Sequence, residues 1–129
     1  MNTAAGNNAA SQEPTLEDLV QDWEFFPDLA EKWDIPVTRV HNMVSEGRLL
    51  TAKVGERHAR AIPALFLVED GPLEPLKGTI SVLRDARFSD EEAIRWLYTP
   101  DGSLPGRPID ALREGRKTEI RRRAQALAW

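Results

Sequence analysis

Apolar residues recur at helical spacing in the first third of the chain, and capping residues mark where each helix begins. Thr15 can cap a short helix whose apolar side continues to Trp23. A second helix is expected over residues 28–33 and a third over residues 37–46, with Gly47 as the C-terminal stop. The pattern therefore predicts three short helices before the first change of spacing.

After Gly47 the spacing changes to the shorter alternation that is typical of strands. Residues 48–54 are expected to form one strand and residues 57–62 a returning strand, joined by a turn at Gly55 and Glu56. The middle of the chain is therefore predicted to hold a small β-hairpin.

A segment dense in Pro, Gly and acidic residues, 69–75, is the clearest boundary in the chain. Beyond it the spacing is helical again, with a capping box at Ser89. Four further helices are expected, over residues 76–87, 89–98, 108–113 and 116–128. The predicted fold class is mostly α with a small β-hairpin.

The second and third helices have the residue types that a helix-turn-helix requires. Ala30 is small where the helices cross, Asp34 follows four residues later in the turn, and Val40 lies six residues further on. Glycine is commoner in this turn, but the short Asp side chain tolerates left-handed backbone angles. Supporting apolar positions are filled by Leu29, Trp33, Ile35 and Met43. We therefore predict a helix-turn-helix at about residues 26–46.

The outward face of the third helix carries hydrogen-bonding side chains. This face consists of Thr38, Arg39, His41, Asn42 and Ser45. Arg, Asn and Ser or Thr are the side chains that bind base edges and phosphates in DNA. The alternative is an ordinary solvated helix with mixed polar residues.

The hairpin that follows is rich in bases and is predicted to be a wing beside the recognition helix. The candidate DNA-binding residues of this region are Arg48, Lys53, Arg57, His58 and Arg60. We expect Lys53 and Arg57 near the tip to contact phosphates, which supplies affinity and salt dependence more than sequence choice. The alternative is a solvated basic hairpin.

The chain of 129 residues has a net charge of −4, and this total hides a strong segregation of charge. Residues 1–26 carry five acids and no Lys or Arg, residues 37–62 have a net charge of +3, and residues 113–123 one of +4. An acidic arm and basic patches can coexist under a negative total. We expect residues 1–14 to be a disordered tail, since they offer almost nothing to bury.

Composition and motifs argue against several other classes of protein. There is no cysteine, no stretch apolar enough to span a membrane and no secretory signal, so a cytoplasmic, nucleoid-associated location is expected. No phosphate-binding loop, nucleophile elbow or metal-ligand spacing is present, and His41 and His58 lie among bases. We therefore predict no catalysis, no cofactor and no metal.

Several motifs together resemble a small actinobacterial family of winged helix-turn-helix DNA-binding proteins, with an N-terminal domain similar to those of excisionases and MerR-type proteins. These motifs are Pro36–Val40, Glu46–Leu49, Ser81–Asp85, Arg95–Asp101, Arg107–Leu112 and Arg121–Ala126. The resemblance covers about four-fifths of the chain. It implies a winged DNA-binding domain over residues 15–68, a helical C-terminal domain over residues 76–129 packed on it, and a role as a transcriptional regulator or nucleoid-associated factor on double-stranded DNA.

Some members of that family are substrates of serine/threonine protein kinases, so Thr3 and Thr15 are candidate phosphorylation sites. Both lie in the acidic arm without bases nearby. A phosphate there adds negative charge and is expected to repel DNA.

A rival interpretation concerns the C-terminal part. Residues 96–101 and 104–112 also look like the toxin-binding segment of one class of antitoxins, in which a DNA-binding domain is joined to a helical domain that holds a partner protein. This alternative predicts a partner-binding patch near Trp96, Leu104 and Trp129.

Overall fold

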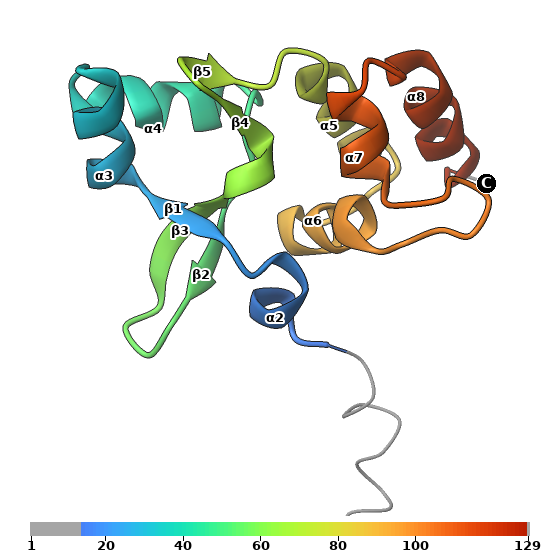
Figure 1. The fold of residues 1–129 in the computed structure, drawn as a ribbon, viewed down its shortest axis with the longest axis horizontal. Coiled ribbons are helices and arrows are strands. Elements are labelled where there is room, and N and C mark those ends of the chain that lie inside the picture. The colour runs from blue at the N-terminus through green and yellow to red at the C-terminus, as the bar shows by residue number, and fades with distance from the viewer. Residues whose placement is uncertain (1–13, 129) are drawn as a thin grey trace, which may run out of the picture.

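The computed structural model describes residues 14–128, so most of the expected tail, with Thr3, and also Trp129 lie outside the described residues (Figure 1). The helices are α2 (Leu16–Val20), α3 (Phe26–Trp33), α4 (Val37–Ser45), α5 (Leu76–Asp85), α6 (Asp90–Tyr98), α7 (Pro108–Arg113) and α8 (Lys117–Ala126). The strands are β1 (Trp23–Phe25), β2 (Ala52–Val54), β3 (Ala59–Pro63), β4 (Leu67–Val68) and β5 (Gly71–Pro72), with a 3₁₀ turn η1 (Ala64–Phe66) between β3 and β4. The predicted class, mostly α with a small β-hairpin, is confirmed.

Strand β1 corrects the expectation that helical spacing continues to Trp23. Helix α2 ends at Val20 because Gln21 has a φ of 70°, and the chain then extends. Trp23 pairs with Pro63 and Phe25 with Ala61, so β3 becomes the central strand in the order β1-β3-β2. Pairing with a strand almost 40 residues away provides backbone partners that local spacing does not reveal.

The strand expected over residues 48–54 is shorter, because only residues 52–54 pair with β3. Leu49 and Leu50 precede it as fully buried core residues. The returning strand likewise begins at Ala59 and not at Arg57, because the four residues before it form the turn. The predicted boundary at 69–75 holds part of a second hairpin, in which Leu67 pairs with Pro72.

Most helix ends agree with the capping residues. The Thr15 hydroxyl accepts the Asp18 N–H at 3.1 Å, and Ser89 and Glu92 form the reciprocal capping box. Gly47 has a φ of 78°, which permits the Arg48 N–H to reach the Met43 carbonyl and end α4. Helices α5 and α8 are shorter than expected, and Arg116 is the N-cap of α8.

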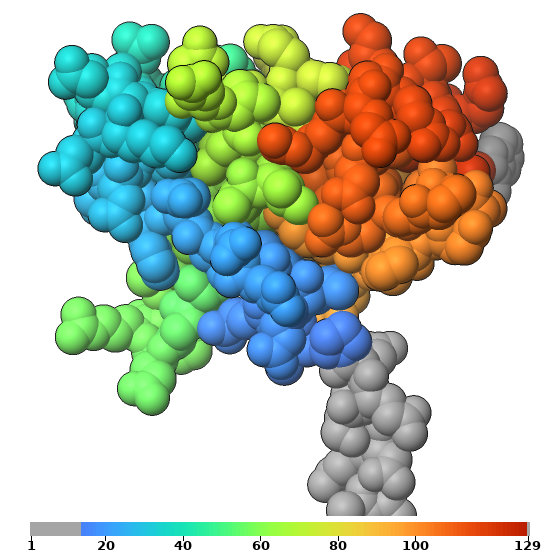
Figure 2. Space-filling view, viewed as in Figure 1, coloured from blue at the N-terminus to red at the C-terminus, as the bar shows by residue number. Residues whose placement is uncertain are grey.

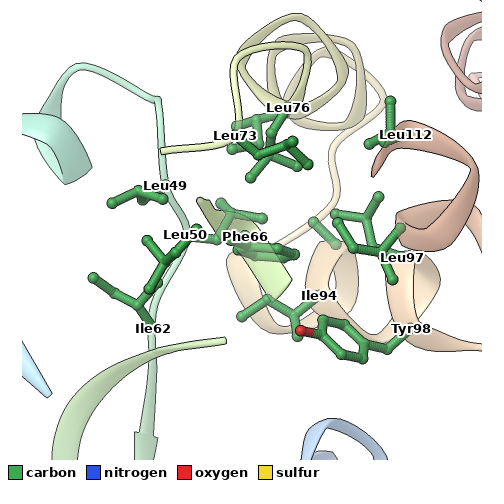
Figure 3. Packing of buried hydrophobic residues seen from close by; sticks show 14 of the residues in the cluster. Leu49, Leu50, Ile62, Phe66, Leu73, Leu76, Ile94, Leu97, Tyr98 and Leu112 are labelled. Carbon is green, nitrogen blue, oxygen red and sulfur yellow. The ribbon is translucent and has the colours of Figure 1, made fainter. Parts of the chain in front are cut away.

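A single hydrophobic cluster joins the winged and helical parts (Figure 3). Phe66 is fully buried at its centre, with Leu50 and Ile62 on one side and Leu97 and Tyr98 on the other. The C-terminal helices are therefore packed directly on the winged part, as expected.

The described residues include no helix long and apolar enough to cross a membrane.

Polar contacts reinforce this junction. The Leu65 N–H donates to the Tyr98 hydroxyl at 3.1 Å, and Arg113 Nη1 donates to the carbonyls of Leu65 and Leu67 at 2.8 and 2.9 Å. Residues on α6 and α7 thus hold the segment that leaves the wing on both sides of Phe66.

Candidate nucleic-acid interface

Helices α3 and α4 are joined by a turn that holds them at a fixed angle. Asp34 adopts left-handed angles, φ 55° and ψ 51°, and the Ile35 N–H donates to the Ala30 carbonyl at 3.0 Å. Ala30 and Val40 are both buried between the helices. The short Asp side chain therefore fills the turn position where glycine is commoner, as the sequence predicts.

The polar residues of α4 form a central column of three, with Arg39 on one side of it and His41 on the other. Thr38, Asn42 and Ser45 lie opposite the buried side that Val40 and Met43 form, since successive residues turn by about 100°. The Ser45 hydroxyl donates back to the carbonyls of His41 and Asn42, at 3.2 and 3.1 Å. Thr38 and Asn42 are consequently the residues of the central column whose donors stay available to a ligand.

The side of α4 nearest the wing carries His41, which packs on the ring of Phe26 with the ring centroids 4.6 Å apart. The Arg60 guanidinium lies 5.3 Å from the centre of the same ring, and its Nη2 donates to the Thr51 hydroxyl at 3.2 Å. Phe26 thereby joins helix α4 to strand β3 through the side chains of His41 and Arg60.

The wing projects from the body of the molecule (Figure 2). Lys53 lies opposite Arg60 in the hairpin, and Arg57 and His58 lie in its turn, which Gly55 opens with a φ of 75°. Lys53 and Arg57 are exposed, and no carboxylate of residues 14–128 lies within 4 Å of either. These two side chains are therefore free to meet an anion.

Two predicted site residues lie away from the wing. Arg48 precedes β2 and its Nη2 lies 3.9 Å from a carboxylate oxygen of Glu74. Arg39, on the side of α4 opposite to His41, lines an open cleft with Arg48 and with Asp70 of the second hairpin. The structure thus brings His41 and Arg60 together on one side of α4, with Lys53 paired to Arg60 and Arg57 in the hairpin turn. Arg39 and Arg48 lie together at the other side.

The basic residues of the C-terminal part are arranged differently. Arg116 and Arg123 donate to the two carboxylate oxygens of Glu119, at 2.8 and 3.1 Å, and these bonds lower the pKa of Glu119. Arg123 also donates to the Ser103 hydroxyl at 2.8 Å. Two of the six bases of residues 113–123, Arg116 and Arg123, are therefore paired with carboxylates within the protein.

Sequence reasoning missed one polar contact of the wing. Oε2 of Glu17, in α2, accepts the backbone N–H of Gly55 at 2.8 Å. The two residues lie 38 positions apart, and an acid in an acidic arm gives no signal of a contact with a basic hairpin. Thr15, at the start of the same helix, is exposed, and its phosphorylation stays a prediction.

No group of three or more His, Cys, Asp or Glu within residues 14–128 is arranged to hold a metal ion. The geometry of α3, α4 and the β2–β3 hairpin instead defines a winged helix-turn-helix protein with a helical C-terminal part. The chain belongs to the Rv2175c family. The family model described as "DNA-binding protein Rv2175c, wHTH domain" matches residues 14–67, and "Rv2175c C-terminal domain of unknown function" matches residues 73–128.

Similar proteins agree with this assignment. The DNA-binding protein Rv2175c of Mycobacterium tuberculosis is 34% identical over 116 residues, which cover 80% of this chain and 78% of the relative. The NMR structure of Rv2175c has a TM-score of 0.74 at 32% identity, covering 84% of this chain and 82% of the other. The resemblance to an actinobacterial winged helix-turn-helix family is confirmed.

The antitoxin alternative gains no support from these comparisons. Leu104, which that alternative places in a partner-binding patch, is only 3% exposed and packs in the core. Trp96 is partly buried against the same core. Leu104 and Trp96 therefore pack in or against the hydrophobic core.

Proposed function

We propose that this protein binds double-stranded DNA and acts on the chromosome as a transcriptional regulator or nucleoid-associated factor. In this proposal α4 lies in the major groove and the wing lies on the sugar-phosphate backbone. The observation that carries it is the exposed, unpaired pair Lys53 and Arg57 on a hairpin joined to α4 through His41, Phe26 and Arg60. The DNA-binding name of the mycobacterial relative supports it.

Base recognition is assigned to Arg39 and Asn42, with Thr38 and His41 as neighbours on the exposed surface of α4. Arg and Asn can each form two hydrogen bonds to one base edge in the major groove. Replacing Arg39 and Asn42 together should reduce discrimination among DNA sequences by about 1–3 kcal/mol for each base that is no longer recognised. Binding of one preferred and one scrambled duplex measures this reduction, and full discrimination in the double variant contradicts the assignment.

Backbone contact is assigned to Lys53 and Arg57. Affinity falls as the salt concentration rises, and each neutralised phosphate makes the plot of log affinity against log salt concentration steeper by about 0.9. The slope measured for the variant K53Q/R57Q should therefore be less steep by roughly 2. Anisotropy titrations of one labelled duplex at several salt concentrations measure the slope. K117Q/R122Q is the matched control, since it removes the same charge from exposed positions of α8. Equal effects of both variants would show that net charge, and not the wing, governs binding.

A further inference from the structure

We propose that Glu17 is a positioning residue for DNA binding, whose carboxylate holds the turn of the wing where Lys53 and Arg57 can meet phosphates. This inference rests on the proposed function. Its basis is the 2.8 Å hydrogen bond from the Gly55 N–H to Glu17 Oε2. A hydrogen bond to a charged acceptor is about twice as strong as one between neutral groups.

Gly55 is the residue through which the wing turn can be fixed. It follows β2 directly, has a φ of 75°, and its carbonyl accepts the His58 N–H at 3.2 Å across the turn. Lys53 lies two residues before it and Arg57 two residues after it. A restraint on the Gly55 backbone therefore acts on both phosphate-binding side chains.

The helix that carries Glu17 is itself fixed to the C-terminal part. Figure 1 shows α2 between the wing and α6. Val20 is buried in the shared core, Leu16 packs partly against it, and Arg95 of α6 donates to the Pro14 carbonyl at 2.9 Å. A continuous series of contacts thus runs from α6 through α2 and Glu17 to the wing turn. This gives the C-terminal domain a role in the arrangement of the DNA-binding surface.

The sign of the effect separates this role from simple electrostatics. Removing an acid near a phosphate-binding site reduces repulsion, so charge alone predicts tighter DNA binding by a Glu17 variant. Loss of the anchor predicts weaker binding. Asp18 is the matched control, because it is an exposed acid on the same helix whose carboxylate has no partner within the described residues.

The test compares full-length wild type with the variants Glu17→Ala, Glu17→Gln and Asp18→Ala on one labelled duplex. Glu17→Ala should bind about two- to tenfold more weakly, which is the range for loss of one hydrogen bond. Glu17→Gln keeps an acceptor oxygen and should be intermediate. Asp18→Ala should bind as tightly as wild type or more tightly.

A double-mutant cycle locates the effect in the wing. In the background K53Q/R57Q the Glu17→Ala change should no longer alter affinity, because the side chains that it positions are absent. Amide hydrogen exchange should become faster at Gly55 while the amides of α4 keep their protection, which a general loss of stability would not produce. If Glu17→Ala does not fold, Glu17→Gln provides the same comparisons.

Three results overturn the proposal: Glu17→Ala binding as tightly as Asp18→Ala, an equal loss in both backgrounds, or unchanged exchange at Gly55. Failure of the proposed function is distinct, since it appears as absence of salt-dependent DNA binding by the wild type. Wild-type binding with an inert Glu17 rejects the positioning role alone.

Discussion

The winged part and the helical part of this protein both carry many basic residues, but they use them differently. In the helical part Arg107 donates twice to Asp110, at 2.8 Å each, and Arg116 donates to Glu119. In the wing Lys53 and Arg57 are exposed with no acidic partner in residues 14–128. Several bases of the helical part are thus held in ion pairs, whereas Lys53 and Arg57 of the wing are not.

This difference teaches that the number of bases in a segment does not give the number of bases that are free to meet an anion. Residues 113–123 have a higher net charge than residues 37–62, +4 against +3. Arg116 and Arg123 are paired with Glu119 and would have to break these bonds before they meet a phosphate, whereas Lys117 and Arg122 of the same helix are exposed. Exposed bases without an ion pair therefore occur in both regions of the described chain, Lys53 and Arg57 in the wing and Lys117 and Arg122 in α8.

The largest expected effect tests whether the two regions are one folding unit. Phe66→Ala should lower the free energy of unfolding by about 3–5 kcal/mol, because Phe66 is fully buried between them. Urea denaturation measures the loss. Protection against amide hydrogen exchange at Val40 in α4 and at Ile94 in α6 should fall to the same value. Phe25→Ala, at an exposed phenylalanine, is the control. Protection that is retained in one region alone would show that the two regions unfold independently.

A smaller effect is expected at the hydrogen bond between the regions. Tyr98→Phe should cost about 1–3 kcal/mol at neutral pH, because the Leu65 N–H loses its acceptor. Burial raises the pKa of Tyr98 from 10.0 to about 12, so the folded state keeps the proton that the unfolded chain loses. This contribution to stability is complete below pH 10 and is lost as the pH rises through about 12.

The alkaline part of that prediction has a direct measurement. Tyr98 is the single tyrosine of the chain, so its phenolate absorbance reports this group alone. Urea denaturation of wild type and Tyr98→Phe across the same pH range should show that the variant lacks the tyrosine share of the alkaline loss. Identical pH dependence in the two proteins would contradict the assignment.

Asp110→Asn sharpens the contrast between paired and unpaired charge. The hydrogen bond from Arg107 lowers the pKa of Asp110 below its ordinary 3.8, so the pair stabilises the folded state above that pH and loses this contribution as the pH falls. The partly exposed pair is worth up to about 1 kcal/mol. Thermal unfolding at neutral and acidic pH measures it. DNA affinity should be unchanged, whereas K53Q/R57Q should change affinity and leave stability unchanged.

The smallest effect is expected in the turn of the helix-turn-helix. Asp34→Gly should stabilise the fold by about 0.5 kcal/mol, less than the roughly 1–2 kcal/mol that left-handed angles cost most residues, because Asp tolerates them. Thermal unfolding detects the gain, and DNA affinity should stay the same. A loss of stability would mean that the Asp34 carboxylate itself holds the turn.

The parts of the fold that depend on local chemistry could be predicted from the sequence. Thr15, Gly47 and Ser89 marked helix ends because their side chains or backbone angles act within a few residues. Strand β1 and the β4–β5 hairpin escaped prediction, since two- or three-residue strands have no detectable alternation and exist through distant partners.

The placement of the candidate site residues in the fold was predictable to the same degree. The polar positions of α4 follow from its period, and Lys53 and Arg57 follow from the hairpin turn. The partners of Arg48 and Arg60 did not follow, because they depend on how Glu74 and Phe26 approach in three dimensions. The contact between Glu17 and Gly55 did not follow either, because it joins residues 38 positions apart.

The hydrogen bonds from Arg113 to the segment around Phe66 also bear on biosynthesis. Leu65 and Arg113 are separated by 48 residues. At about 5–20 residues per second, Leu65 is therefore synthesised roughly 2–10 seconds before Arg113. Until α6 has been made, the apolar surface that Tyr98 and Leu97 later cover is exposed on the nascent chain. Slow codons before α6 should therefore increase capture by chaperones, without any change to the finished protein.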